Sequence, residues 1–216
     1  GTLVLAFSET YWSQALSIEV YSLHVLFLAL LLLLFTKAMF LNTLHEKEKA
    51  EFRNYYWFIF AFVLGLSFTN HGTTILLAPA FLTAYFYVFG ITSRRSWKSL
   101  AQLALPFLAG VSVVLYLPAR ASANPMMNWG DPDTLEKLLW HIRGRQYTVW
   151  LFESWENAGK QLKYFFFTLP EKFAYFPLAI GALGAWKLFK TNRALFVLTV
   201  LLFVACVGYA INYDIH

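Results

Sequence analysis

The 216-residue sequence is 59% hydrophobic and 19% aromatic. Only 13% of its residues are charged, compared with about 25% in a typical soluble domain. Because the apolar residues form long blocks, this composition excludes an ordinary soluble domain and predicts several transmembrane helices. The net charge of +5 does not indicate nucleic acid, because basic residues collect in the cytoplasmic loops of membrane proteins.

Apolar segments follow one another along the chain with polar breaks between them. A first block spans 20–41. A second spans 55–89, which is too long for one helix and is interrupted by Thr69-Asn70-His71-Gly72. Further segments cover 100–117, 173–189 and 194–212. A transmembrane helix needs roughly 20 residues, so we expect six crossings and an all-α, polytopic transmembrane helical bundle.

The basic residues set the predicted orientation of these helices. Ten of the 17 lysines and arginines fall in three short connections, at 37–53, 94–98 and 187–193. By the positive-inside rule these connections are cytoplasmic. Glu19, the Asn70-His71 pair and the long segment after residue 117 are then expected to share the non-cytoplasmic face.

The longest connection, about residues 119–172, is predicted to be an outer loop that carries two short amphipathic helices. Asp133 resembles an N-cap, with Glu136 three residues later as in a capping box. A second amphipathic segment spans 155–167 and is expected to stop at Pro170, because proline interrupts a helix. We expect both helices to lie along the membrane interface.

Three residues at the predicted outer helix ends are candidates for chemistry. Glu19 either suits the dipole of a helix start or serves as a base, a phosphate-site acid or a metal ligand. Asn70 and His71 either cap a helix end or supply a pair of hydrogen-bond donors to a phosphate or hydroxyl. Glu19 and His71 are therefore the candidate catalytic residues, and Glu19 is also the candidate metal ligand.

The outer loop contains three arginines that form two basic groups, Arg120 and the pair Arg143 and Arg145. One interpretation is that these side chains contact lipid headgroups while their stems stay in apolar surroundings. The other is phosphate recognition, because a guanidinium group can clamp a phosphate with two parallel hydrogen bonds.

The turn at 128–132 lies between these two basic groups. A structural turn explains its glycine and proline. It explains Asn128 and Trp129 less well, since an aromatic ring stacks on a sugar face while an amide bonds sugar hydroxyls. Asn128, Trp129 and Asp131 are therefore candidate substrate-binding residues, together with Asn70 and the three arginines.

Common catalytic motifs are missing from the sequence, which contains no P-loop, no Gly-x-Gly-x-x-Gly, no His-Glu-x-x-His and no Gly-x-Ser-x-Gly. No chain of charges runs through the spanning segments, so a proton pump or ion channel is not indicated. No inverted repeat is evident, which leaves a lipid or polyprenol transporter as a weaker alternative.

Three segments of the sequence resemble glycosyltransferase family 117, which groups bacterial membrane proteins with animal protein O-mannosyltransferases. They are 7–21 (FSETYWSQA to EVY), 65–71 (GLSFTNH) and 117–132 (LPAR to NWGDP), in the order expected for that family. The family is similar to GT-C enzymes, which are multispanning transferases. The resemblance implies a GT-C-like fold and a polyprenyl-phosphate sugar as the donor substrate.

The resemblance also implies a division of roles. Arg120, with Arg143 or Arg145, would neutralise the leaving phosphate. Glu19 and His71 would orient that phosphate, with a divalent cation as one option, and Asn128 and Trp129 would face the sugar or the acceptor. In this family an Asp-x-Gly-Glu type motif lies upstream of the Trp-Ser-Gln-Ala segment, so we expect residues 1–216 to be one transmembrane domain of a longer protein.

The function expected from the sequence is sugar transfer to an acceptor hydroxyl, on a protein or a glycan, at the periplasmic face of a bacterial inner membrane. The expected partners are the lipid-linked donor, membrane lipids and the acceptor, without nucleic acid. The alternative is a non-catalytic subunit that binds lipid and packs in a larger membrane complex.

Overall fold

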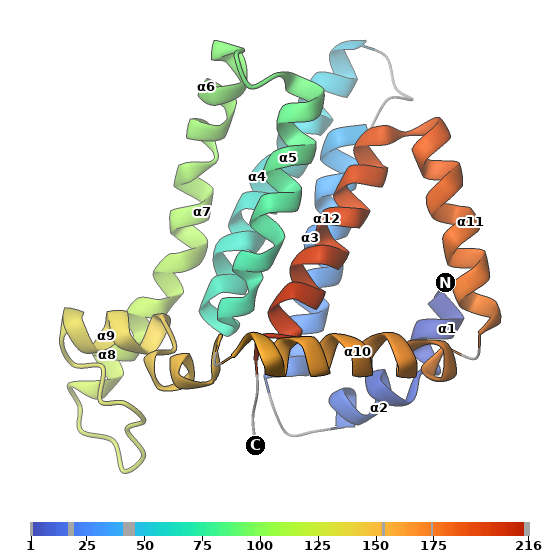
Figure 1. Ribbon diagram of the computed structural model, residues 1–216. Coiled ribbons are helices and arrows are strands. Elements are labelled where there is room, and N and C mark those ends of the chain that lie inside the picture. Colours follow the sequence, from blue (N-terminus) through green and yellow to red (C-terminus); the bar gives the residue numbers. More distant parts are fainter. Residues whose placement is uncertain (1, 17–19, 41–45, 153, 174, 214–216) are drawn as a thin grey trace. The chain divides into compact units, whose positions relative to one another are not determined.

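The computed structural model describes residues 2–16, 20–40, 46–152, 154–173 and 175–213. Every regular element in these ranges is a helix (Figure 1), and one isolated antiparallel bridge joins Leu151 to Tyr213. The expectation of an all-α chain is therefore confirmed. The described residues divide into two compact units, one made of 23–75 and 91–148 and the other of 1–22, 76–90 and 149–216.

The unit made of 23–75 and 91–148 is called the site unit here. Its helices are α3 (Tyr21–Phe40), of which the first two residues fall outside the unit, α4 (Glu46–Asn70), α6 (Arg94–Gln102), α7 (Ala104–Val111), α8 (Tyr116–Ala121) and α9 (Leu135–Ile142). The unit also contains the 3₁₀ turn η2 (Ser112–Leu115) and the first part of η3 (Arg145–Trp150). A further 3₁₀ turn, η1 (Gly72–Leu77), follows α4 and leads toward the other unit.

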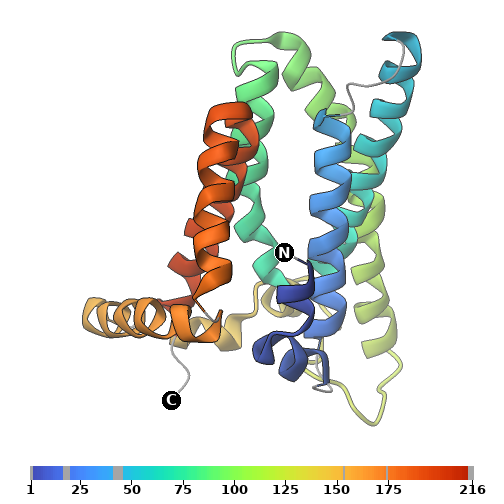
Figure 2. The same cartoon turned by 90° about the vertical axis from the view of Figure 1, so that its right-hand side faces the viewer.

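The other unit contains α1 (Thr2–Ala6), α2 (Glu9–Leu16), α5 (Ala78–Phe89), α10 (Trp155–Lys172), α11 (Phe176–Thr191) and α12 (Arg193–Ala210). Its α12 packs against both α5 and α11. Figures 1 and 2 agree that α10 runs across the end of α12, and the rings of Phe165 and Phe203 lie 6.1 Å apart there. An amphipathic helix that lies across the end of an apolar one fits the predicted interfacial position.

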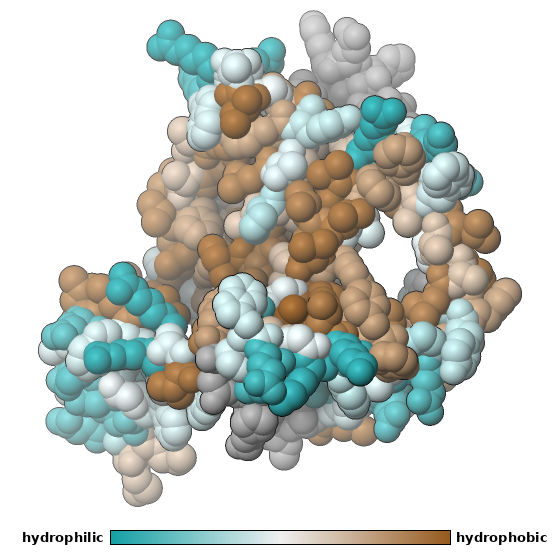
Figure 3. Space-filling model, viewed as in Figure 1, coloured by the Kyte–Doolittle hydropathy of each residue, from teal (hydrophilic) through white to brown (hydrophobic). Residues whose placement is uncertain are grey.

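Four helical runs in the described part of the chain are long and apolar enough to cross a membrane. They are Tyr21–Met39, Gly72–Phe89, Arg94–Ala121 and Arg193–Ala210. Brown side chains cover much of α5, α7 and α12, and teal ones gather over α9 and α10 (Figure 3). Because apolar side chains face outward on these helices, the protein is a membrane protein.

Six crossings were predicted, but only four of the expected segments correspond to full-length helical runs among the described residues. The apolar part of α4, Tyr55–Asn70, is shorter than these four. The expected segment 173–189 forms α11, which has 16 residues. The predicted break at 69–72 is present, since α4 ends at Asn70 and η1 begins at Gly72.

Two predicted helix boundaries are wrong. Thr134, and not Asp133, caps α9, because the Thr134 side chain accepts a hydrogen bond from the backbone N–H of Lys137 at 3.3 Å. The second predicted amphipathic helix, α10, continues through Pro170 to Lys172. A proline in the last turn removes only one intrahelical hydrogen bond, so it does not end this helix.

Prolines explain why the run Arg94–Ala121 is divided into shorter pieces. Pro106 lacks the N–H that would bond the carbonyl of Gln102, and α6 ends at Gln102. Pro118 likewise cannot bond the carbonyl of Val114, which lies in the 3₁₀ turn η2. The α-helical hydrogen bonding is therefore interrupted near each proline, while Arg94–Ala121 remains one continuous helical run.

Aromatic rings fill the contact between α3 and α4 in the site unit. Phe35 is buried, and its ring centroid lies 5.5 Å from those of both Trp57 and Phe60. The Trp57 and Phe60 rings meet edge to face at 5.8 Å. Edge-to-face geometry is favourable for aromatic rings, so this cluster fixes how α4 is rotated against α3.

Two glycines bring α4 and α7 into close contact. A Cβ atom on Gly65 would overlap the carbonyl oxygen of Phe107 and lie 2.8 Å from the nitrogen of Val111. A Cβ atom on Gly110 would overlap the carbonyl oxygen of Phe62 in the same way. Small residues allow such backbone contact between membrane helices.

We therefore expect Gly65→Ala and Gly110→Ala each to destabilise the site unit by about 1–3 kcal/mol, the usual cost of overpacking. The backbone atoms that the new methyl group would meet cannot turn aside as a side chain could. Thermal unfolding of the protein in lipid nanodiscs measures the effect. Gly184→Ala in α11, which has open space around the Cβ position, is the matched control, and equal stability of all three variants would contradict the close contact.

Candidate functional site

The end of α4 turns sharply into η1, and the chain satisfies this turn with its own polar groups. The backbone N–H of His71 donates to the carbonyl of Ser67 at 3.1 Å, and that of Thr74 donates to the carbonyl of His71 at 3.2 Å. The Ser67 and Thr74 hydroxyls, both buried, lie 2.7 Å apart. An apolar environment offers no other partners, so these bonds permit a break within apolar sequence.

One hydroxyl group links two imidazole rings beside this turn. Thr73 Oγ1 lies 2.6 Å from Nδ1 of His71 and 3.0 Å from Nε2 of His24, near the start of α3. The backbone N–H of Thr73 also donates to His71 Nδ1 at 3.3 Å. The two ring centroids are 4.7 Å apart. His24, His71 and Thr73 are called the histidine corner here.

Burial differs between the two imidazoles. His24 is only 9% exposed, and its Nδ1 atom is buried without a hydrogen-bond partner among the described residues. An unsatisfied buried polar atom costs about 1–3 kcal/mol, which makes this position unusual for a purely structural residue. His71 is half-buried, and burial lowers its pKa below the ordinary 6.5, so the ring is neutral at physiological pH.

Several predicted site residues of the site unit lie on helices that meet at one of its ends. Figures 1 and 2 show that α3 begins, α4 ends and α8 ends on the same side of this unit. Asn70 is the last residue of α4, and Arg120 lies in the last turn of α8. The site unit thus brings the regions of His71 and Arg120 to one end, as the sequence predicted.

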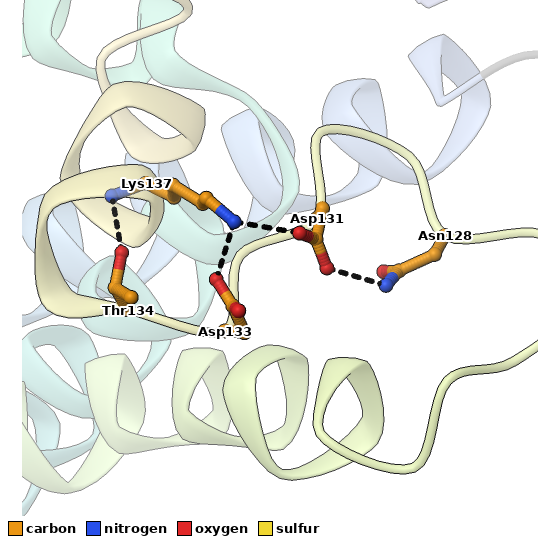
Figure 4. A network of polar contacts seen from close by, with 5 residues as sticks. All are labelled: Asn128, Asp131, Asp133, Thr134 and Lys137. Carbon is orange, nitrogen blue, oxygen red and sulfur yellow. Dashed lines mark hydrogen bonds and ion pairs between the residues drawn. The ribbon is translucent and has the colours of Figure 1, made fainter.

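A second polar group, here called the loop network, braces the turn after α8 (Figure 4). The Asn128 amide donates to Asp131 Oδ1 at 2.7 Å, and the Lys137 ammonium group bonds Asp131 Oδ2 at 2.6 Å and Asp133 Oδ1 at 2.7 Å. Gly130 has a φ of +72°, a conformation that glycine adopts without strain. The network therefore holds the turn against the start of α9.

The loop network engages two of the predicted substrate-binding side chains. The Asn128 amide donates to the Asp131 carboxylate, and this carboxylate also accepts from Lys137, so these contacts explain the shape of the turn. Trp129, between them, is 75% exposed. Its ring is available for stacking on a sugar, and the binding role of all three residues stays a prediction.

The arginines differ in their surroundings. Arg120 is exposed at the end of α8, and Arg143 is exposed at the end of α9. The Arg145 guanidinium group lies over the Trp140 ring, 4.1 Å from its centroid, in a cation–π contact. All three arginines are therefore exposed, and Arg145 differs in that its guanidinium group contacts an aromatic ring of α9.

His24 was not predicted from the sequence as a functional residue. Its only signal is an imidazole within an apolar helix, and its partners lie 47 and 49 positions away in the sequence. Glu19 lies outside the described residues. In the part of the chain that the structure describes, no group of three or more His, Cys, Asp or Glu side chains could hold a metal ion.

Comparisons of the sequence with known proteins find similarity to one family. Residues 1–94 match the family model described as the "Protein O-mannosyl-transferase TMEM260 N-terminal domain". The chain is 29% identical over 145 residues to "Protein O-mannosyl-transferase TMEM260" of Mus musculus, which covers 67% of this chain and 20% of the relative. No solved structure matches this chain.

A relative from Dictyostelium discoideum, also named a protein O-mannosyl-transferase, is 23% identical over 198 residues. This match covers 86% of the chain and 24% of the relative. The chain thus spans about a fifth to a quarter of the length of the curated relatives it matches. These similarities support an O-mannosyltransferase-like family and suggest a glycosyltransferase.

The loop network predicts a pH dependence for its own turn. The hydrogen bond from Lys137 lowers the pKa of Asp133 below 3.8, and the bonds to Asp131 and Asp133 raise the pKa of Lys137 above 10.5. The contribution of Asp133 to loop stability is complete above pH 3.8 and is lost as pH falls through the lowered pKa. That of Lys137 is complete below pH 10.5 and is lost as pH rises through the raised pKa.

We expect Lys137→Met to raise the pKa of Asp133 toward 3.8, because the largest cause of its lowering is removed. Carboxyl ¹³C titration of the labelled protein in nanodiscs measures this change. Lys160→Met, which breaks the exposed Lys160–Glu156 pair in α10, is the matched control. An Asp133 pKa that ignores Lys137→Met would show that the two side chains are not paired in solution.

Proposed function

We propose that this chain is part of a GT-C-like membrane glycosyltransferase that moves a hexose from a polyprenyl-phosphate donor to a protein hydroxyl at the non-cytoplasmic face. The histidine corner is the observation that carries the proposal. It sets two imidazoles, linked through the Thr73 hydroxyl, at the end of apolar helices, where the phosphate of a lipid-linked sugar would lie. The names of the relatives support a sugar donor and a protein acceptor.

The chemistry requires one bond to form and one to break. The acceptor hydroxyl oxygen bonds to the anomeric carbon of the sugar, while the bond from that carbon to the phosphate oxygen breaks. The phosphate leaves with the bonding electrons, and the hydroxyl proton passes to a carboxylate base, for which Glu19 is the candidate in this chain. Donors aimed at the departing oxygen lower the barrier because negative charge develops there.

The described residues would divide this task at one end of the site unit. His71 would direct an uncharged N–H group at the phosphate, with Asn70 beside it in the sequence. Arg120, exposed at the end of α8, would add positive charge. Trp129 would stack on the sugar or the acceptor, held in place by the loop network that shapes its turn.

The proposal is tested with the full-length gene product in nanodiscs, supplied with a labelled polyprenyl-phosphate mannose and acceptor polypeptides. Labelled polypeptide that depends on the lipid-linked donor and is lost in His71→Ala would support the proposal. A folded protein that binds the donor lipid but transfers no sugar would point instead to a lipid-binding subunit. A parallel reaction with a chelator, followed by Mg²⁺, tests the divalent cation proposed at Glu19.

We expect Arg120→Ala to lower the transfer rate by about 10²-fold or more, the usual effect of removing one donor to a developing oxyanion. Arg120→Lys keeps the charge but loses the forked geometry, so an intermediate rate is expected. Arg94→Ala removes the same side chain from the opposite end of the run Arg94–Ala121 and serves as the matched control. Full activity of Arg120→Ala would remove this residue from the phosphate site.

A further inference from the structure

We propose that His24 is a positioning residue that fixes the position of the proton on His71 through the Thr73 hydroxyl. In this arrangement His24 Nε2–H donates to Thr73 Oγ1, the Thr73 hydroxyl donates to His71 Nδ1, and the proton of His71 lies on Nε2. The ligand of His71 would be an oxyanion, the phosphate oxygen of a lipid-linked donor. The identity of this ligand rests on the proposed function, whereas the positions of the protons do not.

The backbone determines the direction of the chain of hydrogen bonds. The Thr73 backbone N–H has no lone pair and can only donate, and its acceptor is His71 Nδ1 at 3.3 Å. His71 Nδ1 therefore bears no proton. The Thr73 hydroxyl, 2.6 Å from the same nitrogen, must then be the donor in that contact.

The rest of the order follows because a hydroxyl group has one proton. Thr73 has used its proton toward His71, so it accepts in its 3.0 Å contact with His24, and His24 Nε2 carries the N–H. The opposite order would need His71 Nδ1 to donate to Thr73 Oγ1. The Thr73 backbone N–H would then point at a nitrogen that already carries a proton. Two donors would face each other, and that hydrogen bond would be lost.

The unpartnered atom of His24 agrees with this order. Neutral His24 with its proton on Nε2 has only a lone pair on Nδ1, and Nδ1 is the buried atom without a partner among the described residues. A buried polar group left unpaired in a native protein requires an explanation. Here the explanation is that the other ring nitrogen of His24, Nε2, donates to the Thr73 hydroxyl, which in turn donates to His71.

The fixed proton order decides what His71 can do. Its Nδ1 lone pair already accepts two hydrogen bonds, from the Thr73 N–H and hydroxyl groups. Its Nε2 carries the proton and can donate to an oxyanion, but it cannot take a proton from the acceptor hydroxyl. His71 is therefore an uncharged donor to the phosphate and not the general base of the reaction.

The test uses the full-length protein in nanodiscs, labelled with ¹⁵N-histidine, and magic-angle-spinning NMR without any donor lipid. The His71 signal is assigned from its loss in His71→Gln. One-bond N–H couplings show which ring nitrogen carries the proton, and we expect it on Nε2 of His71 and on Nε2 of His24. A proton on Nδ1 of His71 in the wild-type protein would overturn the proposal.

Matched variants separate the relay from simple packing. His24→Gln keeps an N–H donor near the position of Nε2, whereas His24→Leu removes it. Thr73→Ser keeps the hydroxyl, whereas Thr73→Val removes it. Thr69→Val is the control, because it deletes a hydroxyl that bonds the carbonyl of Leu66, one turn away.

We expect His24→Leu and Thr73→Val to give a mixture of His71 tautomers and to lower the transfer rate at saturating donor at least about tenfold, as loss of an outer partner of a functional histidine does. His24→Gln, Thr73→Ser and Thr69→Val should keep the wild-type spectrum and a rate within a few-fold. An unchanged His71 tautomer in His24→Leu and Thr73→Val, with folding shown by equal thermal midpoints, would overturn the relay. Wild-type protein without transfer activity would reject the proposed function alone, since the spectra decide the relay independently.

Discussion

The structure depends on one constraint, which is that polar groups inside apolar surroundings must find their partners within the chain. The end of α4 shows how the chain meets it. The carbonyl of Ser67 accepts from the His71 N–H, and the Ser67 and Thr74 hydroxyls bond each other. These bonds pair the Ser67 carbonyl and both hydroxyls where the helix stops among apolar segments, and the residues that follow it become available for a site.

The packing of α4 determines where this site lies. With 3.6 residues per turn, Phe60 and Ser67 fall on one face of the helix, because they are seven positions apart. Phe60 contacts Phe35 of α3. Gly65 lies on the other side, against Gly110 of α7. The ring cluster and the glycine contact together fix the rotation of α4, so the turn after it lies beside the start of α3. His24 in α3 lies there at hydrogen-bond distance from Thr73.

Much of this could be predicted from the sequence, because composition and helix breaks are local properties. The apolar blocks, the break at 69–72 and the two amphipathic helices follow from hydrophobicity, Gly and Pro. The cap of α9 could not be assigned so surely, since Asp133 and Thr134 are both good caps; the pairing of Asp133 with Lys137 decided it. The proposed role of His24 could not be predicted from the sequence, because a single histidine in an apolar helix does not indicate which partner tertiary packing will bring to it.

This end of the site unit carries a neutral donor, His71, and a charged donor, Arg120, and the free-energy cost of burying each group explains where it lies. A buried cation loses its hydration, and a single partner seldom compensates for that loss. A neutral imidazole pays far less when it is half-buried, provided that its lone pair is bonded. His71 meets this condition through Thr73, whereas Arg120 keeps its charge at the surface. In the proposed function, a site at the lipid boundary can thus hold a phosphate with an uncharged donor on the apolar side and a solvated cation on the polar side.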